Sequence, residues 1–418
     1  MIKNRLIFQS LLKQKDSQKI SLLIGARQVG KTTLLKQLHN NICNNEKKKG
    51  LFIDFDIFTN FEKVSTFENL LNTIKLNGYK EDQKDFFYIF LDEFQRYSDF
   101  SIILKNVYDN LKNVKIYASG SSSIKIKNQV QESLAGRKII NKIYPLNFEE
   151  YLYFKEKNSL LRQIENIGKL KGKELHKVTL ELKRELEEFL IYGSYPEVVL
   201  TPEGEKQKIL ESIFDLYIKK DLIEYLNIKK IANVKKLIEY LAINNGQKIK
   251  YEEISKVCSL EYKEVINYLE IIEETFLIKI IRPFYKNKNK ELTKIPKIYF
   301  IDSGVRNYFI NNFNKLSLRT DSGYLFEGFI MSELIKKDID KIKFWQNKNK
   351  QEVDLIIEGN TLIPLEIKFK ENLKNDDEIG LKAFFHEYAP KKSYLINLSV
   401  QEIKDKINFI LPYNLDLG

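Results

Sequence analysis

The chain has 418 residues, with 69 Lys and Arg against 57 Asp and Glu, and a formal net charge of +12. Hydrophobic residues make up 43% of the sequence and aromatic residues 12%, which excludes a wholly disordered chain. No apolar run approaches the ~20 residues of a membrane span, and the first apolar run is too short for a signal peptide. Cys43 and Cys258 form no CxxC pair. We therefore expect a reduced, cytoplasmic protein of two to four domains with no membrane partner.

Residues 1–150 alternate between short apolar strands and helical segments. This alternation predicts a doubly wound α/β domain with a parallel sheet. The run at 86–91 is apolar throughout, as is typical of a strand buried on both faces. The expected strands are Ile20–Ile24, Leu51–Asp56, Phe86–Leu91 and Ile116–Ala118, and the helix after the first strand is expected over Thr32–Asn40.

Residues 151–230 are charged and helical in spacing, interrupted at Tyr192–Pro196, and predict a helical segment. Residues 231–304 predict three helices, at 231–241, 251–257 and 261–274, then strands at 276–281 and 297–301 around a polar loop. Three helices with a two-stranded wing are the outline of a winged helix. Residues 305–418 predict a further α/β unit. Its expected elements are a helix at 323–336, strands at 343–345, 352–357, 362–369 and 393–397, and a helix at 380–388.

A phosphate-binding loop follows the first strand. Gly25-Ala26-Arg27-Gln28-Val29-Gly30-Lys31-Thr32 matches GxxxxGK[ST] at every position, with Thr33 continuing into the helix. The glycines let backbone N–H groups face phosphate oxygens, and the helix directs its positive end at the same anion. We predict that residues 25–33 bind ATP, that Lys31 reaches the β- and γ-phosphates, and that the Thr32 hydroxyl ligates Mg²⁺.

An acid pair ends the apolar strand about 60 residues later. We predict that Asp92 supports Mg²⁺ and that Glu93 is the general base for the attacking water. Ser121, in the Ser119–Ser123 cluster, is either a γ-phosphate sensor or part of a plain turn. Arg137 is either a surface residue or a second sensor, acting in cis or on a neighbouring subunit of a homo-oligomer.

The loop between the two wing strands is basic. From Arg282 to Lys297 it holds six basic residues and one acid, Glu291. Lys286, Lys288 and Lys290 are therefore candidate contacts to a nucleic-acid backbone. The helix before the wing carries five glutamates, which argues against its entry into a DNA groove. A module used only for packing remains the alternative.

A second carboxylate group lies near the C-terminus. Asp354 and Glu366-Ile367-Lys368 lie on successive strands of a predicted hairpin, and Glu327 lies on the preceding helix. Asp354 and Glu366 are candidate ligands of a divalent metal, with Lys368 beside the scissile phosphate and Glu327 as a further ligand. A solvated Glu–Lys strand face is the alternative.

Together these motifs resemble the prokaryotic P-loop ATPases of the AAA+ superfamily that carry a C-terminal DUF4143 region, which itself resembles the PD-(D/E)xK nuclease fold. The resemblance rests on 25–33, Leu91–Gln95, 120–123, 134–137 with 144–146, 193–197, 299–304, 326–327, 352–354 and 366–368. It implies an α/β P-loop AAA+ core at 1–150, a helical lid at 151–230, a winged helix at 231–304 and a nuclease-like α/β domain at 305–418. ATP and Mg²⁺ are the implied cofactors.

Three functions remain open at this point. The first is a Mg²⁺-dependent ATPase that acts on or near nucleic acid, and the second is an ATP-gated nuclease. The third is a nucleotide-switched scaffold that binds a protein partner and carries a catalytically silent nuclease fold. DNA affinity that falls steeply with salt separates the first two from the third.

Overall fold

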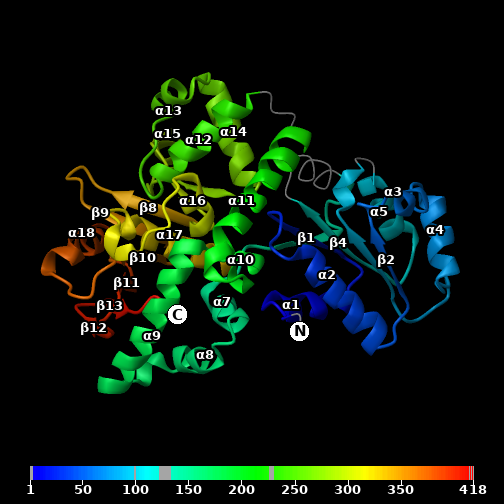
Figure 1. The fold of residues 1–418 in the computed structure, drawn as a ribbon, viewed down its shortest axis with the longest axis horizontal. Coiled ribbons are helices and arrows are strands. Elements are labelled where there is room, and N and C mark those ends of the chain that lie inside the picture. Colours follow the sequence, from blue (N-terminus) through cyan, green and yellow to red (C-terminus); the bar gives the residue numbers. More distant parts are fainter. Residues whose placement is uncertain are drawn as a thin grey trace. The chain divides into compact units, whose positions relative to one another are not determined.

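The computed structural model describes residues 3–97, 100–121, 133–225, 230–413, 415 and 417 (Figure 1). The chain divides into two compact units. Unit 1 comprises residues 1–144 with Glu274–Phe276, and unit 2 comprises 145–273 with 277–418. Among the described residues, no helix has the length and apolar character needed to cross a membrane.

Unit 1 is built on a five-stranded sheet in the order β2-β3-β4-β1-β5. Every neighbouring pair in it is parallel, as predicted for a doubly wound domain. The edge strand β5 was not predicted, because it has a lysine at each end and its apolar centre is too short to indicate a strand. The strands are β1 (Ile20–Gly25), β2 (Gly50–Asp54), β3 (Phe87–Asp92), β4 (Val114–Ser121) and β5 (Lys138–Lys142).

The helices of unit 1 connect these strands. The buried cores of α4 and α5 pack with β1 to β4 in one apolar cluster that includes Leu22, Phe55, Leu91 and Leu104. The helix that follows β1 is α2 (Lys31–His39), which continues as the wider turn η2 (Asn40–Asn45). The others are α1 (Ile7–Lys13), η1 (Gln14–Asp16), α3 (Phe58–Glu62), α4 (Phe67–Leu76), η3 (Phe94–Arg96) and α5 (Phe100–Asn110).

Unit 2 begins with helices, as predicted for residues 151–230. The described chain from 145 to 225 contains no strand, and α9 ends at Tyr192 where Gly193 takes a φ of 76°. These helices are α7 (Phe148–Phe154), α8 (Asn158–Glu165), η4 (Ile167–Lys169), α9 (Gly172–Tyr192), α10 (Pro196–Leu200), η5 (Glu203–Glu205), α11 (Lys206–Leu216) and η6 (Tyr217–Tyr225).

Three helices and an antiparallel strand pair follow, in the predicted order. They are α12 (Ile231–Ile243), α13 (Tyr251–Cys258), α14 (Tyr262–Glu274), β6 (Ile278–Ile281) and β7 (Lys297–Phe300). The loop between the strands was predicted to be polar. It contains the short helix α15 (Lys288–Thr293), whose Glu291 is buried.

The C-terminal part of unit 2 holds a six-stranded mixed sheet in the order β12-β13-β11-β10-β9-β8. The strands β8 (Ile342–Gln346), β9 (Glu352–Glu358), β10 (Leu362–Ile367) and β11 (Ser393–Ile396) match the prediction. Two further strands, β12 (Glu402–Lys404) and β13 (Ile407–Ile410), were not predicted, since β12 is exposed and short. The helices are α16 (Ser303–Phe309), η7 (Leu316–Leu318), α17 (Ser322–Lys336), η8 (Asn375–Glu378) and α18 (Ile379–Tyr388).

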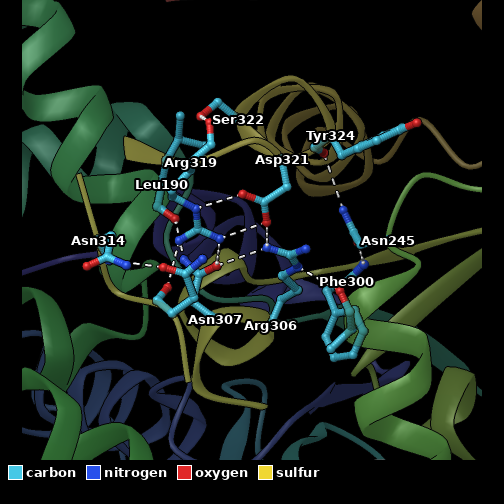
Figure 2. A network of polar contacts seen from close by, with 12 residues as sticks. Leu190, Asn245, Phe300, Arg306, Asn307, Asn314, Arg319, Asp321, Ser322 and Tyr324 are labelled. Carbon is cyan, nitrogen blue, oxygen red and sulfur yellow. Dashed lines mark hydrogen bonds and ion pairs between the residues drawn. The ribbon is translucent and has the colours of Figure 1, made fainter. Parts of the chain in front are cut away.

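Helix α17 is apolar on nearly all sides and packs against α9, β7 and β10. A buried polar network fixes the segment that leads into it (Figure 2). Asp321 accepts hydrogen bonds from Arg306 and from Arg319, whose Nε lies 2.8 Å away. Asn307 donates to the Leu190 carbonyl of α9 at 2.9 Å. The segment predicted as a lid is thus packed into the same unit as the C-terminal sheet.

Candidate functional site

The loop between β1 and α2 is shaped by its two glycines. A Cβ on Gly25 would lie 1.9 Å from the carbonyl oxygen of Ile143, so the strand end has room only for glycine. Gly30 has a φ of 96°, a conformation that L side chains rarely adopt, and it caps α2 directly before Lys31. Val29 points into the core with no exposed surface. The loop therefore turns back on itself at the positive end of the helix.

Lys31 lies inside this loop. Its side chain is buried, and its Nζ donates to the carbonyls of Gly25 at 3.0 Å and Ala26 at 2.6 Å. An ammonium group buried inside this loop is suited to bind an anion such as phosphate. This is the position that the sequence predicted for the phosphate-binding lysine.

Three polar side chains meet at the carboxyl edge of the sheet beside the loop. Asp92 ends β3 and is 3% exposed, and its carboxylate accepts hydrogen bonds from the hydroxyls of Ser119 on β4 and Thr32 on α2. Burial raises the pKa of Asp92, and the nearby carboxylates of Glu93 and Asp54 raise it further, whereas the two hydroxyls lower it. A cation at this edge would relieve the repulsion between the carboxylates.

Glu93 follows Asp92 in a left-handed conformation, with a φ of 54°. This conformation is costly for a residue other than glycine and recurs at functional sites. Its backbone N–H donates to Ser119 Oγ at 3.4 Å, and its Oε2 accepts from Gln95 Nε2 at 2.5 Å. Backbone and carboxylate are both held, so Glu93 is oriented rather than free on the surface.

Comparisons with known proteins agree with this geometry. The family model described as AAA domain matches residues 17–152. Residues 17–152 are thus similar to AAA domains, and this part of the chain is called the AAA domain for that similarity. Two domains of unknown function, DUF8612 and DUF4143, match residues 183–316 and 322–415.

The relatives of the whole chain are uncharacterized proteins. One, from Methanocaldococcus jannaschii, is 27% identical over 93% of this chain and 83% of its own length. Another, from Haemophilus influenzae, is 25% identical over 91% of this chain and 90% of its own. Among solved structures, the Walker-type ATPase of Pyrococcus abyssi is 14% identical, covers 74% of this chain and 96% of its own, and gives a TM-score of 0.47. DnaA from Aquifex aeolicus with bound AMPPCP is 17% identical, covers 68% and 89%, and gives 0.27.

Two further residues of the AAA domain were predicted as sensors. Ser121 pairs in register with Gly25, so its backbone lies beside the first glycine of the loop. Ser122 and Ser123 lie outside the described residues. Arg137 immediately precedes β5, and its carbonyl accepts from the N–H of Ile20, at the amino end of β1. At ~3.3 Å per residue, the six residues of β1 put Arg137 roughly 16–20 Å from its own loop.

Arg137 therefore does not join the site of its own domain. It instead forms a bidentate ion pair with Asp109, at 2.7 and 3.0 Å. Sequence reasoning missed Ser119 and Asp54. Both could have been found, because Ser119 begins the serine cluster and Asp54 ends β2 in register with Asp92.

The second carboxylate group is brought together inside unit 2. Asp354 on β9 accepts from the N–H of Ile367 at 2.8 Å, and Lys368 donates to Glu366 Oε1 at 2.5 Å. Glu366 is buried, and its Oε2 has no hydrogen-bond partner among the described atoms. Burial raises the pKa of Glu366 well above its usual range, and Asp354 raises it further.

Glu327 on α17 completes the group of carboxylates. Its Oε1 accepts from Tyr299 and from Lys297, whose Nζ is 3.2 Å away. Burial raises the pKa of Glu327 to about 7. Across the parts of the chain that the structure describes, no three Asp, Glu, His or Cys side chains are arranged to hold a metal ion. The predicted ligands Asp354 and Glu366 lie on the neighbouring strands β9 and β10.

The basic loop between β6 and β7 (residues 282–296) lies along the C-terminal sheet. The N–H of Phe284 donates to the carbonyl of Phe344 on β8 at 2.6 Å. Lys288 forms ion pairs with Glu358 at 2.5 Å and with Glu291 at 3.2 Å. Lys286 lies 5.1 Å from the ring centroid of Tyr388, and Lys290 is exposed. Of the three lysines predicted to contact nucleic acid, Lys288 is thus committed to internal ion pairs.

Proposed function

We propose that the AAA domain binds and hydrolyses ATP with Mg²⁺. The observation that carries this proposal is the contact of Asp92 with the hydroxyls of both Thr32 and Ser119 at the mouth of the phosphate-binding loop. One buried carboxylate and one hydroxyl are oxygen ligands of the kind that Mg²⁺ binds. Thr32 and Asp92 would hold the ion, which neutralises phosphate charge when bound.

The other predicted residues bind the phosphates or act on the attacking water. The backbone N–H groups of residues 25–33 cradle the phosphates, and Lys31 turns from the carbonyls of Gly25 and Ala26 toward the β- and γ-phosphates. Glu93 orients the attacking water and takes its proton. Ser121, whose backbone pairs with Gly25, would contact the γ-phosphate. For Arg137, the remaining role is in trans, on the nucleotide of a neighbouring subunit of a homo-oligomer.

Binding of ATP tests this proposal at its first step. We expect Lys31→Ala to lower the affinity for ATP at least tenfold, because the buried ammonium is the fixed charge nearest the phosphates. Fluorescence of a labelled ATP analogue measures the affinity. Lys36→Ala, on the same helix but at an exposed position, is the matched control and should bind normally. Equal affinities of wild type and Lys31→Ala would remove the loop from nucleotide binding.

We further propose that ATP turnover acts on or near nucleic acid. The net charge of +12 and the exposed Lys286 and Lys290 support this proposal. In this account the chain comprises the AAA core at 1–150, a helical lid at 151–230, a winged helix at 231–304 and a PD-(D/E)xK nuclease-like domain at 305–418. DNA affinity should then fall steeply as salt rises from 50 to 200 mM. Lys290→Glu should weaken it, and an affinity insensitive to salt would refute nucleic-acid binding.

A second function, a nucleotide-switched protein scaffold with a silent nuclease fold, is favoured by one observation. Glu327, Glu352 and Glu366 of the nuclease-like region are already paired with lysines of the same unit. The two functions differ in their products. Cleavage of supercoiled plasmid that disappears in Asp354→Ala supports the ATP-gated nuclease, and intact plasmid under ATP turnover supports the scaffold.

A further inference from the structure

A lysine from outside the predicted nuclease motif lies among its carboxylates. Lys297 begins β7, and only 6% of its side chain is exposed. Its Nζ is 3.2 Å from Glu327 Oε1 and 2.6 Å from Glu352 Oε1. Tyr299, two residues further along β7, donates to the same Glu327 oxygen. One strand therefore supplies both an ammonium and a hydroxyl to the carboxylates.

The charges of this group nearly balance without an external ion. Its carboxylates are Glu327, Glu352, Asp354 and Glu366, and its ammonium groups are Lys248, Lys297 and Lys368. Lys248 pairs with the second oxygen of Glu352 at 2.8 Å, and Lys368 pairs with Glu366 at 2.5 Å. A divalent cation placed among these carboxylates would lie near the buried ammonium group of Lys297, where like charges repel strongly because water is excluded.

The residues present thus do not fit the metal that a PD-(D/E)xK nuclease requires. We propose that Lys297, held between Glu327 and Glu352, occupies the place of a divalent cation beside Asp354 and Glu366, making the cluster a metal-free joint between β7 and the six-stranded sheet. The joint connects the strand pair β6–β7 to α17 through Glu327 and to β9 through Glu352.

The surroundings support a joint rather than a catalytic centre. Lys343 on β8 pairs with Glu291 in the loop between β6 and β7, and with Glu358 on β9 at 3.0 Å. Lys288 reaches Glu358 from the same loop. Ion pairs thus run along the whole seam between β6–β7 and the β8–β9 edge, and Lys297 is its most buried cation. This inference is independent of ATP hydrolysis.

Binding of Mn²⁺ to the full-length, nucleotide-free protein tests the proposal. Electron paramagnetic resonance counts the free ion during the titration. We expect wild type and Asp354→Asn to bind Mn²⁺ identically, since the cluster holds no metal in either. Lys297→Met should gain a site that binds at least tenfold more tightly than any in wild type, and Lys297→Met/Asp354→Asn should lose it again.

Two results would overturn the proposal. The first is a Mn²⁺ site in wild type that Asp354→Asn abolishes, which would mean that the ion displaces Lys297. The second is a folded Lys297→Met that gains no site. If Lys297→Met does not fold, the comparison of wild type with Asp354→Asn still decides, because both retain the lysine. Since no nucleotide is present, failure here is separate from failure of the ATPase proposal.

Discussion

Ser119 holds the two acids of the nucleotide site in place, and its removal gives a sharp prediction. Its hydroxyl donates to the Asp92 carboxylate and accepts from the Glu93 N–H at 3.4 Å. In Ser119→Ala, Asp92 keeps only Thr32 of its two hydroxyl partners. Loss of a hydrogen bond to a buried carboxylate costs about 1.5–3 kcal/mol. Partners that orient a metal-supporting carboxylate are typically worth about 10–100-fold in activity, which is the same range.

We therefore expect Ser119→Ala to hydrolyse ATP about 10–100-fold more slowly at saturating nucleotide, with a higher Mg²⁺ requirement. The assay is phosphate release as a function of Mg²⁺ concentration. Affinity for ATP without metal should change little, because Lys31 and the loop backbone are untouched. Ser65→Ala, whose hydroxyl donates to the Glu62 carbonyl in the α3–α4 connection, is the matched control. Wild-type turnover and Mg²⁺ dependence in Ser119→Ala would refute the positioning of Asp92 by Ser119.

Two predictions concern stability. Asp321→Asn leaves two buried guanidinium groups without their carboxylate and should cost about 3–5 kcal/mol of unfolding free energy. Fluorescence of the single tryptophan, Trp345 on β8, reports this loss in urea, and exposed Asp338→Asn should cost less than about 0.5 kcal/mol. Burial raises the pKa of Asp321, but its arginine partners outweigh burial and lower it, so this stabilisation is present above about pH 4 and fades as pH falls through the folded-state pKa. In unit 1, burial lowers the pKa of Lys115 from 10.5 to about 7. Between these values the unfolded chain binds more protons, so stability should rise with pH by up to about 5 kcal/mol, and Lys115→Met should flatten that slope in urea unfolding followed by circular dichroism. A slope unchanged in Lys115→Met, or an Asp321→Asn melt that matches Asp338→Asn, would contradict these assignments.

The sequence predicts the nucleotide site well because that site is local. Residues Gly25 to Thr32 are consecutive in the sequence, so their motif is visible without the fold. Asp92 follows an apolar run that is typical of a buried strand. The sheet order then brings Asp92 to the loop, since neighbouring parallel strands end at one edge. The same rule would have predicted that Asp54, at the end of β2, lies at the same edge as Asp92. Arg137 was misleading because its position at the opposite edge depends on β5, a strand with charged ends.

The contacts of unit 2 were harder to predict because they join distant segments. Lys297 and Glu327 are 30 residues apart, and Lys248 and Glu352 are 104 apart. Neither separation follows a helix or strand period, so the sequence does not show that these residues pair. From composition alone, the loop between β6 and β7 is therefore basic, whereas in the fold it forms ion pairs. Glu291, the one acid in that loop, holds the loop against the sheet, because it accepts from the N–H of Tyr285 and pairs with Lys343 on β8.

We propose that Glu93 activates water for ATP hydrolysis in the AAA domain. Single-turnover hydrolysis of pre-bound ATP by Glu93→Gln, compared with wild type, tests it most directly, because the glutamine keeps the shape and removes only the base. Glu93→Gln should bind ATP with an affinity close to that of wild type and hydrolyse it at least a hundredfold more slowly, in the range expected for loss of general-base catalysis. Hydrolysis by Glu93→Gln at the wild-type rate would show that Glu93 is not the base.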